Sequence, residues 1–210
     1  YDTDFGFGIL WMGLGYDVNT LLFAVEANGP DWPNPPWSTF LLRKLLENQS
    51  YRDRFVNIYA DRLNTVFKSN WLNEKIDNMA SKIENVIPLQ NERWFWSVGD
   101  WDNNIQILRN FADNRSLYVR QHLASFFSLS SPALVTFISS LGGNIKVNTL
   151  ELETYPWTGY YYSSVPIEIE AIAEEGYRFI GWAQYPDSTS KIKIQISNNS
   201  MITALFEELD

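Results

Sequence analysis

The 210-residue sequence contains no cysteine, which excludes disulfide bonds, thiolate metal sites and cysteine nucleophiles. It has one histidine, His122, so no multi-histidine metal site can form, and a Ser-His-Asp triad would depend on this residue alone. Positive charge is also scarce, because 16 Lys and Arg residues face 25 Asp and Glu residues. The net charge of −9 argues against nucleic acid or an anionic membrane as a partner. No apolar run approaches the roughly 20 residues of a membrane-spanning helix.

Apolar residues, in contrast, are plentiful. Hydrophobic residues make up 45% of the chain and aromatic residues 16%, with nine tryptophans. This content is enough to bury a core, and the length suits one or two domains. The many aromatic rings fit either an aromatic core or a surface that faces sugars.

The hydrophobic periodicity changes near residues 128–132, so we expect an α+β protein of two parts. For the first part, residues 1–128, the sequence predicts short N-terminal strands followed by a mainly helical region. Within it, helical spacing predicts helices over about 38–46, 50–67, 71–86, 105–111 and 117–127. The segment 9–27 suggests a hairpin or an irregular loop with a strand in it. The second part, residues 132–210, alternates with period two at 145–147, 167–171, 191–196 and 201–206 and predicts a small antiparallel β-domain.

Local signals predict where the helices begin and end. Ser38 is a candidate N-cap, and Ser50-Tyr51-Arg52-Asp53 resembles a capping box. Pro88 is expected to stop the third helix. Arg115 lies at the expected break between the last two helices, and we predict that it forms a buried ion pair that organises the region. The other arginines of the helical part could form a phosphate- or acid-binding face, but we interpret them as a solvated helix surface that pairs with acids such as Asp53, Asp61 and Asp113.

The first eight residues, Tyr1-Asp2-Thr3-Asp4-Phe5-Gly6-Phe7-Gly8, carry the clearest candidate site. In an extended strand, Asp2 and Asp4 point to the same face. Two carboxylates on one face repel unless a cation lies between them, and Mg²⁺ prefers oxygen ligands. The alternative is a polar strand end with two solvated aspartates. The chain opens inside this motif without a starting Met, so we expect it to be part of a longer protein.

Three segments of the first part resemble the C-terminal half of a spore-coat-H-type (CotH) kinase domain. They are Tyr1–Gly8, Leu41-Leu-Arg-Lys-Leu-Leu-Glu-Asn-Gln-Ser-Tyr-Arg-Asp-Arg-Phe55 and Phe111-Ala-Asp-Asn-Arg-Ser-Leu-Tyr-Val-Arg120. The resemblance covers about residues 1–128. It implies a protein-kinase-like fold that transfers the γ-phosphoryl group of ATP to Ser or Thr of a partner protein.

By the same resemblance, Asp2, Asp4 or both bind the Mg²⁺ of Mg²⁺-ATP. Kinases hold this metal with the Asp of a D-F-G turn, and Asp4-Phe5-Gly6 spells that triplet. The glycine-rich loop, the ATP-anchoring Lys and the catalytic Asp are expected upstream, so no catalytic residue is assigned in this chain. We therefore expect the chain by itself to bind ATP poorly and to transfer nothing.

The second part resembles the divergent internalin-B-type repeat of secreted bacterial proteins. The matching segments are Gly143-Asn-Ile-Lys-Val-Asn148, Gly176-Tyr-Arg-Phe-Ile-Gly-Trp182 and Thr203-Ala-Leu-Phe-Glu207. This resemblance implies a small β-module at the cell exterior, and hence a secreted or cell-surface protein. Partners would be a protein substrate or a surface component.

A cluster of aromatic residues lies in Tyr155–Tyr162. Trp157, Tyr160 and Tyr161 could stack against a ligand such as a sugar ring. The alternative is that Trp157 and some of the tyrosines close one end of a small core, since small domains need large aromatics. Trp182 is predicted to be a core residue. The second functional hypothesis follows from this cluster: a non-catalytic surface, adhesion or carbohydrate-contacting scaffold.

Overall fold

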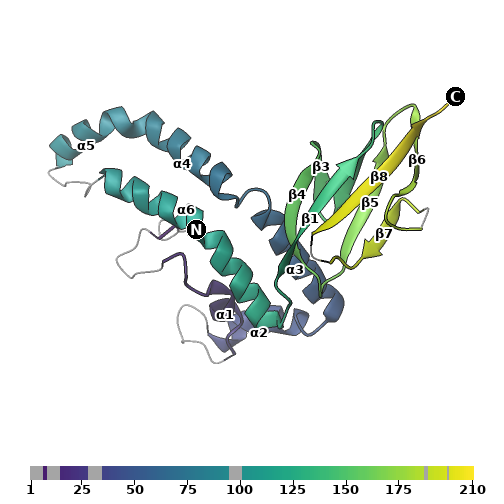
Figure 1. The fold of residues 1–210 in the computed structure, drawn as a ribbon. Coiled ribbons are helices and arrows are strands. Elements are labelled where there is room, and N and C mark those ends of the chain that lie inside the picture. The colour runs from purple at the N-terminus through teal and green to yellow at the C-terminus, as the bar shows by residue number, and fades with distance from the viewer. Residues whose placement is uncertain (1–6, 9–14, 28–34, 95–100, 187–188, 198) are drawn as a thin grey trace. The chain divides into compact units, whose positions relative to one another are not determined.

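The structure is a computed structural model that describes residues 7–8, 15–27, 35–94, 101–186, 189–197 and 199–210. The chain forms two compact units (Figure 1). The first unit contains Tyr1–Phe23 and Thr65–His122, and the second contains Ala24–Asn64 and Leu123–Asp210. Residues 24–64 thus pack in the same unit as the C-terminal β-strands.

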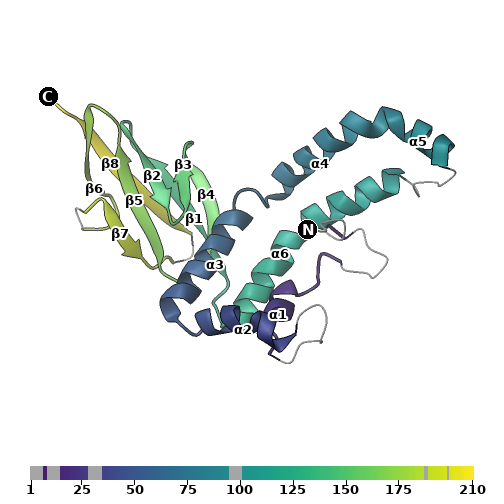
Figure 2. The same ribbon diagram turned by 180° about the vertical axis from the view of Figure 1, so that it is seen from behind.

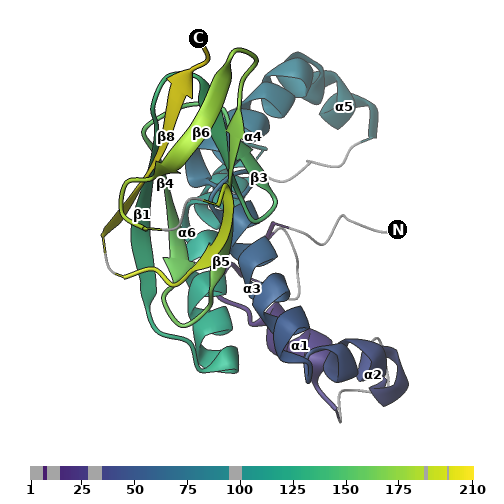
Figure 3. The same ribbon diagram turned by 90° about the vertical axis from the view of Figure 1, so that its right-hand side faces the viewer.

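The second unit is built on two four-stranded sheets, which Figures 2 and 3 show as two layers. The strand order is β4-β1-β8-β6 in one sheet and β3-β2-β5-β7 in the other. The first sheet comprises β1 (Pro132–Ser139), β4 (Trp157–Tyr162), β6 (Tyr177–Trp182) and β8 (Ser200–Glu208). The second comprises β2 (Gly143–Val147), β3 (Leu150–Leu152), β5 (Ile167–Ala173) and β7 (Lys191–Ile194).

One hydrophobic core joins the two sheets because alternate side chains of each strand point inward. In β5, for example, Ile167, Ile169 and Ala171 are buried while Glu168 and Glu170 between them are not. The same alternation confirms the strands predicted from period two, which are β2, β5, β7 and β8. The strands pair antiparallel as predicted, except that β1 and β8 run parallel.

Two of the turns between strands depend on glycine. Gly142 (φ +95°) joins β1 to β2, and Gly176 (φ +84°) joins β5 to β6. Both lie in the left-handed region, which strains any residue with a Cβ atom. A Cβ atom on the adjacent Gly143 would come within 2.4 Å of the Phe206 ring, so glycine also permits close packing there.

Helix α3 (Gln49–Leu63) belongs to the second unit and contacts the β-strands (Figure 3). Its N-cap is Asn48, whose side chain accepts a hydrogen bond from the Tyr51 amide. The predicted capping box at Ser50 is therefore wrong, because the helix begins before Ser50. Helix α2 (Pro36–Leu45) likewise begins before the predicted cap, Ser38. Proline at the first helical position already has the φ angle that a helix needs. Its missing N–H costs nothing there, because the first N–H of a helix has no partner within the helix, and this explains the earlier start.

The first unit pairs α4 (Ser69–Ile83) with α6 (Trp101–Phe127), which begins in this unit and continues into the second. The two helices pack through Leu72, Ile76, Ile105 and Ala112. A 3₁₀ turn, η1 (Glu84–Val86), and α5 (Ile87–Trp94) follow α4. The third predicted helix ends before Pro88, as expected. The sequence did not predict α5, in which Pro88 is the second residue, a position where its missing N–H has no helical partner to lose.

Helix α6 is continuous through residues 113–115, so the break predicted there is wrong. Polar side chains at this point contact the helices themselves: Asn114 donates to the carbonyl of Asn110 within α6, and Asp113 accepts a hydrogen bond from Asn73 of α4. Helix α1 (Thr20–Val25) lies in the segment for which a hairpin or loop was expected. The chain is an α+β protein, with helices before residue 128 and two antiparallel-rich sheets after it.

Candidate functional site

Asp2 and Asp4 lie outside the described residues, whereas Phe7 and Gly8, shortly after them, are described. Phe7 and Gly8 both have positive φ angles, +59° and +79°, so the backbone turns sharply after the motif. The Phe7 ring contacts the Phe111 ring of α6, with 5.1 Å between the ring centroids. Phe7 also packs against the core of the α4–α6 pair. Helix α6 therefore supports the chain at Phe7, three residues after Asp4.

Arg115 of α6 holds the next described segment. Its guanidinium donates hydrogen bonds to the carbonyls of Tyr16 and Val18 at 2.7 and 2.6 Å, and to the Thr20 hydroxyl at 2.8 Å. It also lies over the Phe111 ring, 5.7 Å from the centroid. The organising role predicted for Arg115 agrees with these contacts, although they are made to carbonyls and a hydroxyl from mid-helix. A planar guanidinium offers several donors in fixed directions, which suits such a fork.

His122 lies seven residues, about two turns, further along α6 and is half-buried. Its ring contacts Tyr118, which in turn contacts Tyr16. Burial lowers the pKa of His122, the positive charge of Arg115 lowers it further, and Asp17 opposes both effects. These contacts assign His122 a packing role beside the 15–20 segment.

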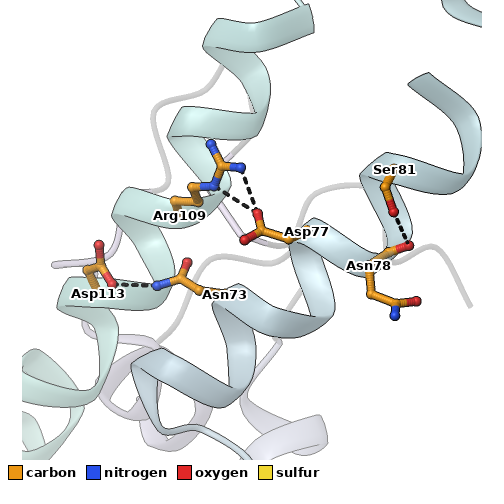
Figure 4. A network of polar contacts seen from close by, with 6 residues as sticks. All are labelled: Asn73, Asp77, Asn78, Ser81, Arg109 and Asp113. Carbon is orange, nitrogen blue, oxygen red and sulfur yellow. Dashed lines mark hydrogen bonds and ion pairs between the residues drawn. The ribbon is translucent and has the colours of Figure 1, made fainter. Parts of the chain in front are cut away.

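Polar contacts fix α4 against α6 in the first unit (Figure 4). Arg109 donates from Nε and Nη2 to the same oxygen of Asp77, at 3.0 and 2.6 Å. Asn73 donates to Asp113 at 2.7 Å, and the Ser69 hydroxyl donates to the same carboxylate. These side chains are largely exposed, so each contact contributes little stability by itself, but together they fix the alignment of the two helices.

Within the described parts of the chain, no group of three His, Asp or Glu side chains could hold a metal ion. The proposed metal ligands Asp2 and Asp4 are outside that search. None of the helices that the structure describes is long and apolar enough to cross a membrane.

The three aromatic candidates of the second unit differ in exposure. The Tyr161 side chain is completely buried and donates to Asp61 at 2.9 Å, so its ring presents no face to a ligand. Trp157 is half-buried and packs against Phe137. Tyr160 is 47% exposed, and stacking on it stays a prediction. Trp182 is 3% exposed, which confirms that it is a core residue.

The sequence interpretation missed a buried polar row on α3, formed by Asn57, Asp61 and Asn64. Asp61 accepts hydrogen bonds from the Thr149 amide and hydroxyl, the Asn148 amide group and the Tyr161 hydroxyl. Burial raises its pKa, and these hydrogen bonds act in the opposite direction. The spacing of the three residues, 57, 61 and 64, places them on one helical face and could have revealed the row.

Asn57 and Asn64 complete the row by binding backbone atoms. Asn57 donates to the Pro166 carbonyl at 2.8 Å, while Asn64 donates to the Tyr160 carbonyl and accepts from its amide, both at 3.0 Å. The two asparagines thereby bind backbone groups of the edge strand β4 and of Pro166, just before β5. Helix α3 is therefore attached to the β-strands by specific polar contacts, in contrast to the surface position that its charged residues suggested.

The searches of curated proteins and of solved structures found no match to this chain. The model of one protein family does match. It is described as CotH kinase protein, and it covers residues 1–119, which is more than half of the chain. The match includes the Asp2/Asp4 motif, the Phe7 turn and Arg115 with the segment it holds. The chain belongs to the CotH kinase protein family.

Proposed function

We propose that this chain is the part of an atypical protein-kinase-like protein that supplies the Mg²⁺ ligands for ATP-dependent phosphoryl transfer to Ser or Thr. Asp2 and Asp4 would hold the metal. Phosphoryl transfer depends on positioning and on neutralising charge at the phosphates, which is what a fixed pair of carboxylates with Mg²⁺ supplies. The family match over residues 1–119 supports the assignment.

The observation that carries the proposal is the anchoring of the chain after the motif. The Phe7–Phe111 contact and the three hydrogen bonds of Arg115 tie both described flanking segments to α6. A metal-ligand segment must be held in one position, because loss of about 1 Å of alignment can cost about 100-fold in rate. The contacts at Phe7 and at residues 16–20 support this role, because they hold the chain on the C-terminal side of the two aspartates.

The donor set also fits the metal. Carboxylate oxygens are the ligands Mg²⁺ prefers, and it commonly uses one or two of them together with phosphate oxygens and water. When bound, Mg²⁺ would neutralise charge that develops on the transferred phosphoryl group. The groups that anchor ATP and accept the substrate proton are expected upstream of Tyr1.

The proposal is tested by phosphoryl transfer from γ-labelled ATP to a library of Ser- and Thr-containing peptides. The enzyme is the longer protein expected from the sequence, with and without Asp2→Asn or Asp4→Asn. We expect at least one substitution to lower the rate by on the order of 100-fold or more. Asp17→Asn, which removes an exposed carboxyl from the same region, is the matched control and should leave the rate unchanged. Transfer that neither substitution affects would overturn the metal assignment.

The second candidate function is a surface scaffold whose kinase-like part makes no phosphoryl transfer. Exposure of the Tyr160 ring favours this alternative, because exposed rings are common platforms for sugars and adhesive contacts. The CotH family is associated with the spore coat, and we propose a secreted or surface location on that basis. The resemblance of the β-strands to an internalin-B-type repeat points to the same exterior location.

A further inference from the structure

A polar pocket of about 400 Å³ lies in the second unit, between α3 and the β3-β2-β5-β7 sheet. Its walls come from α3, the β2–β3 turn and strands β5 and β7. The lining residues are Ser50, Asp53, Arg54, Asn57, Ile58, Asn148, Thr149, Pro166, Glu168 and Lys193. Ile58 and Pro166 are the apolar residues among them, so the pocket favours a charged or strongly polar ligand over an apolar one.

Hydrogen bonds fix the floor of this pocket. Asn57 is bonded to the Pro166 carbonyl, and the Thr149 hydroxyl donates to Asp61. The Asn148 side chain donates to Asp61 and accepts from the Glu168 amide. Because these hydrogen bonds already hold the side chains of Asn57, Asn148 and Thr149, a ligand would enter a preformed site.

The two carboxylates of the pocket have different partners. Glu168 forms an ion pair with Lys191 at 2.7 Å, whereas Asp53 accepts a hydrogen bond at 2.6 Å from the neutral amide of Gln49. In contrast, Arg54 and Lys193 have no hydrogen bond or ion pair to any described residue. Two cationic groups without an ion pair, Arg54 and Lys193, therefore face one carboxylate without an ion pair, Asp53, so the unpaired charge of the pocket is positive on balance although the whole chain carries a net charge of −9.

We propose that this pocket binds a phosphate group, either as the free ion or on a phosphorylated side chain. Arg54 would supply the planar fork that pairs with two phosphate oxygens, and Lys193 a point charge from the opposite wall. The Ser50 hydroxyl, which also lines the pocket, adds a neutral donor. This site is separate from Asp2 and Asp4 and does not depend on phosphoryl transfer by the chain.

The test is a titration of the isotope-labelled chain, followed by NMR, with inorganic phosphate, with a phosphoserine peptide and with the unphosphorylated peptide. We expect the amide signals of Ser50, Arg54, Thr149 and Lys193 to shift with phosphate or the phosphopeptide and not with the unphosphorylated peptide. If the phosphopeptide binds about tenfold more tightly than phosphate, the source is a phosphorylated side chain, and otherwise it is the free ion. An equal response to acetate would overturn the assignment to phosphate.

The paired variant Arg54→Gln with Lys193→Gln should weaken phosphate binding at least about tenfold, since each lost contact is charge-assisted. The matched control is Lys44→Gln with Arg178→Gln, which removes the same charge from exposed residues of the same unit, outside the pocket. All four side chains lie on the surface, so both variants are expected to fold, which circular dichroism checks. The proposal fails if no probe shifts these signals in the millimolar range, or if both paired variants bind equally well.

Discussion

Asp61 places a carboxyl group in the interior of the second unit, with 0% of the residue exposed. A buried carboxylate is costly unless it is well hydrogen-bonded. Here the backbone amide of Thr149 and three side chains of the β-strand region donate to it. The residue stabilises the attachment of α3 and at the same time makes it sensitive to pH.

The pH dependence follows from the raised pKa of Asp61. The native state holds the proton more tightly than the unfolded state, so the contribution of this group to stability is greatest at acidic pH. That contribution falls as the pH rises from the unfolded pKa, about 3.9, through the raised native pKa. Denaturant unfolding between pH 4 and 7.5 should therefore show wild type losing stability relative to Asp61→Asn as the pH rises. A gain in the stability of wild type relative to Asp61→Asn as the pH rises would contradict the assigned direction. Asp53→Asn on the same helix is the control for loss of one carboxyl.

Removal of the Asp61 carboxyl should cost more than its conversion to an amide. Asp61→Ala would leave buried donors of Asn148, Thr149 and Tyr161 without an acceptor, which we expect to cost about 3 kcal/mol in the free energy of unfolding. Tyr161→Phe should be markedly less costly in the Asp61→Ala background than in wild type, because its hydroxyl has then already lost its acceptor. Additive effects of the two substitutions in chemical denaturation would refute this coupling.

Arg115 acts on the first unit through three hydrogen bonds to residues 16–20. Arg115→Met would remove all of them, and we expect a loss of about 2 kcal/mol in unfolding free energy because charge-assisted bonds to partly buried carbonyls are strong. Arg115→Lys should recover only part of the loss, because an ammonium group cannot span the fork. Thermal unfolding measures both, with exposed Lys82→Met as the control. Equal stability of Arg115→Met and wild type would show that the three hydrogen bonds of Arg115 do not stabilise the first unit.

Helix α3 is the element that links the family-matched segment to the β-sheets. Val56, Ala60 and Leu63 on it are buried, and Asn57, Asp61 and Asn64 bind groups of the β-strand region. We expect the amides of residues 56–63 to exchange with solvent as slowly as those of β1 and β5, because opening α3 exposes this polar row. Hydrogen exchange followed by mass spectrometry measures this. Fast exchange in α3 beside slow exchange in the sheets would contradict it.

The elements that the sequence predicted correctly are those with an uninterrupted period. Strands β2, β5, β7 and β8 alternate cleanly, and helix α4 repeats its apolar residues over four turns. Predictions failed where a polar residue or proline has two possible uses. The gap expected between residues 111 and 117 is helical, and its polar residues Asp113 and Asn114 make contacts to α4 and within α6. Pro88 lies in the first turn of α5, a helix that was not predicted. Single-sequence patterns do not distinguish these uses, because the deciding partner is distant in the sequence.

The candidate site was predictable only in part for the same reason. The D-x-D spacing of Asp2 and Asp4 is local, so the sequence alone indicates it. The role of Arg115 depends on carbonyls of residues 16 and 18, almost a hundred positions away, and carbonyls have no sequence signature. The sequence did not indicate the buried polar row of Asn57, Asp61 and Asn64, because a charged residue on a helix with many other charges is most often at the surface.

At the scale of the whole molecule, the second unit should unfold as one body that includes α3. Trp182 is 3% exposed, and its ring packs against Phe179 in the core between the sheets. Trp182→Ala should cost about 3–5 kcal/mol in the unfolding free energy of this unit. We expect hydrogen exchange to show loss of protection in the sheets and α3 together, while the α4–α6 pair keeps its own protection. Protection that persists in α3 after the sheets have lost theirs would contradict a single cooperative unit.

The central claim is that Asp2 and Asp4 hold the Mg²⁺ of Mg²⁺-ATP. Isothermal titration calorimetry of Mg²⁺-ATP tests it most directly, on this chain and on the longer protein, each with and without Asp2→Ala and Asp4→Ala. The account predicts that the longer protein binds, that at least one substitution abolishes binding, and that this chain alone binds poorly. No binding by the longer protein, or binding that neither substitution changes, would contradict the claim and favour the scaffold function.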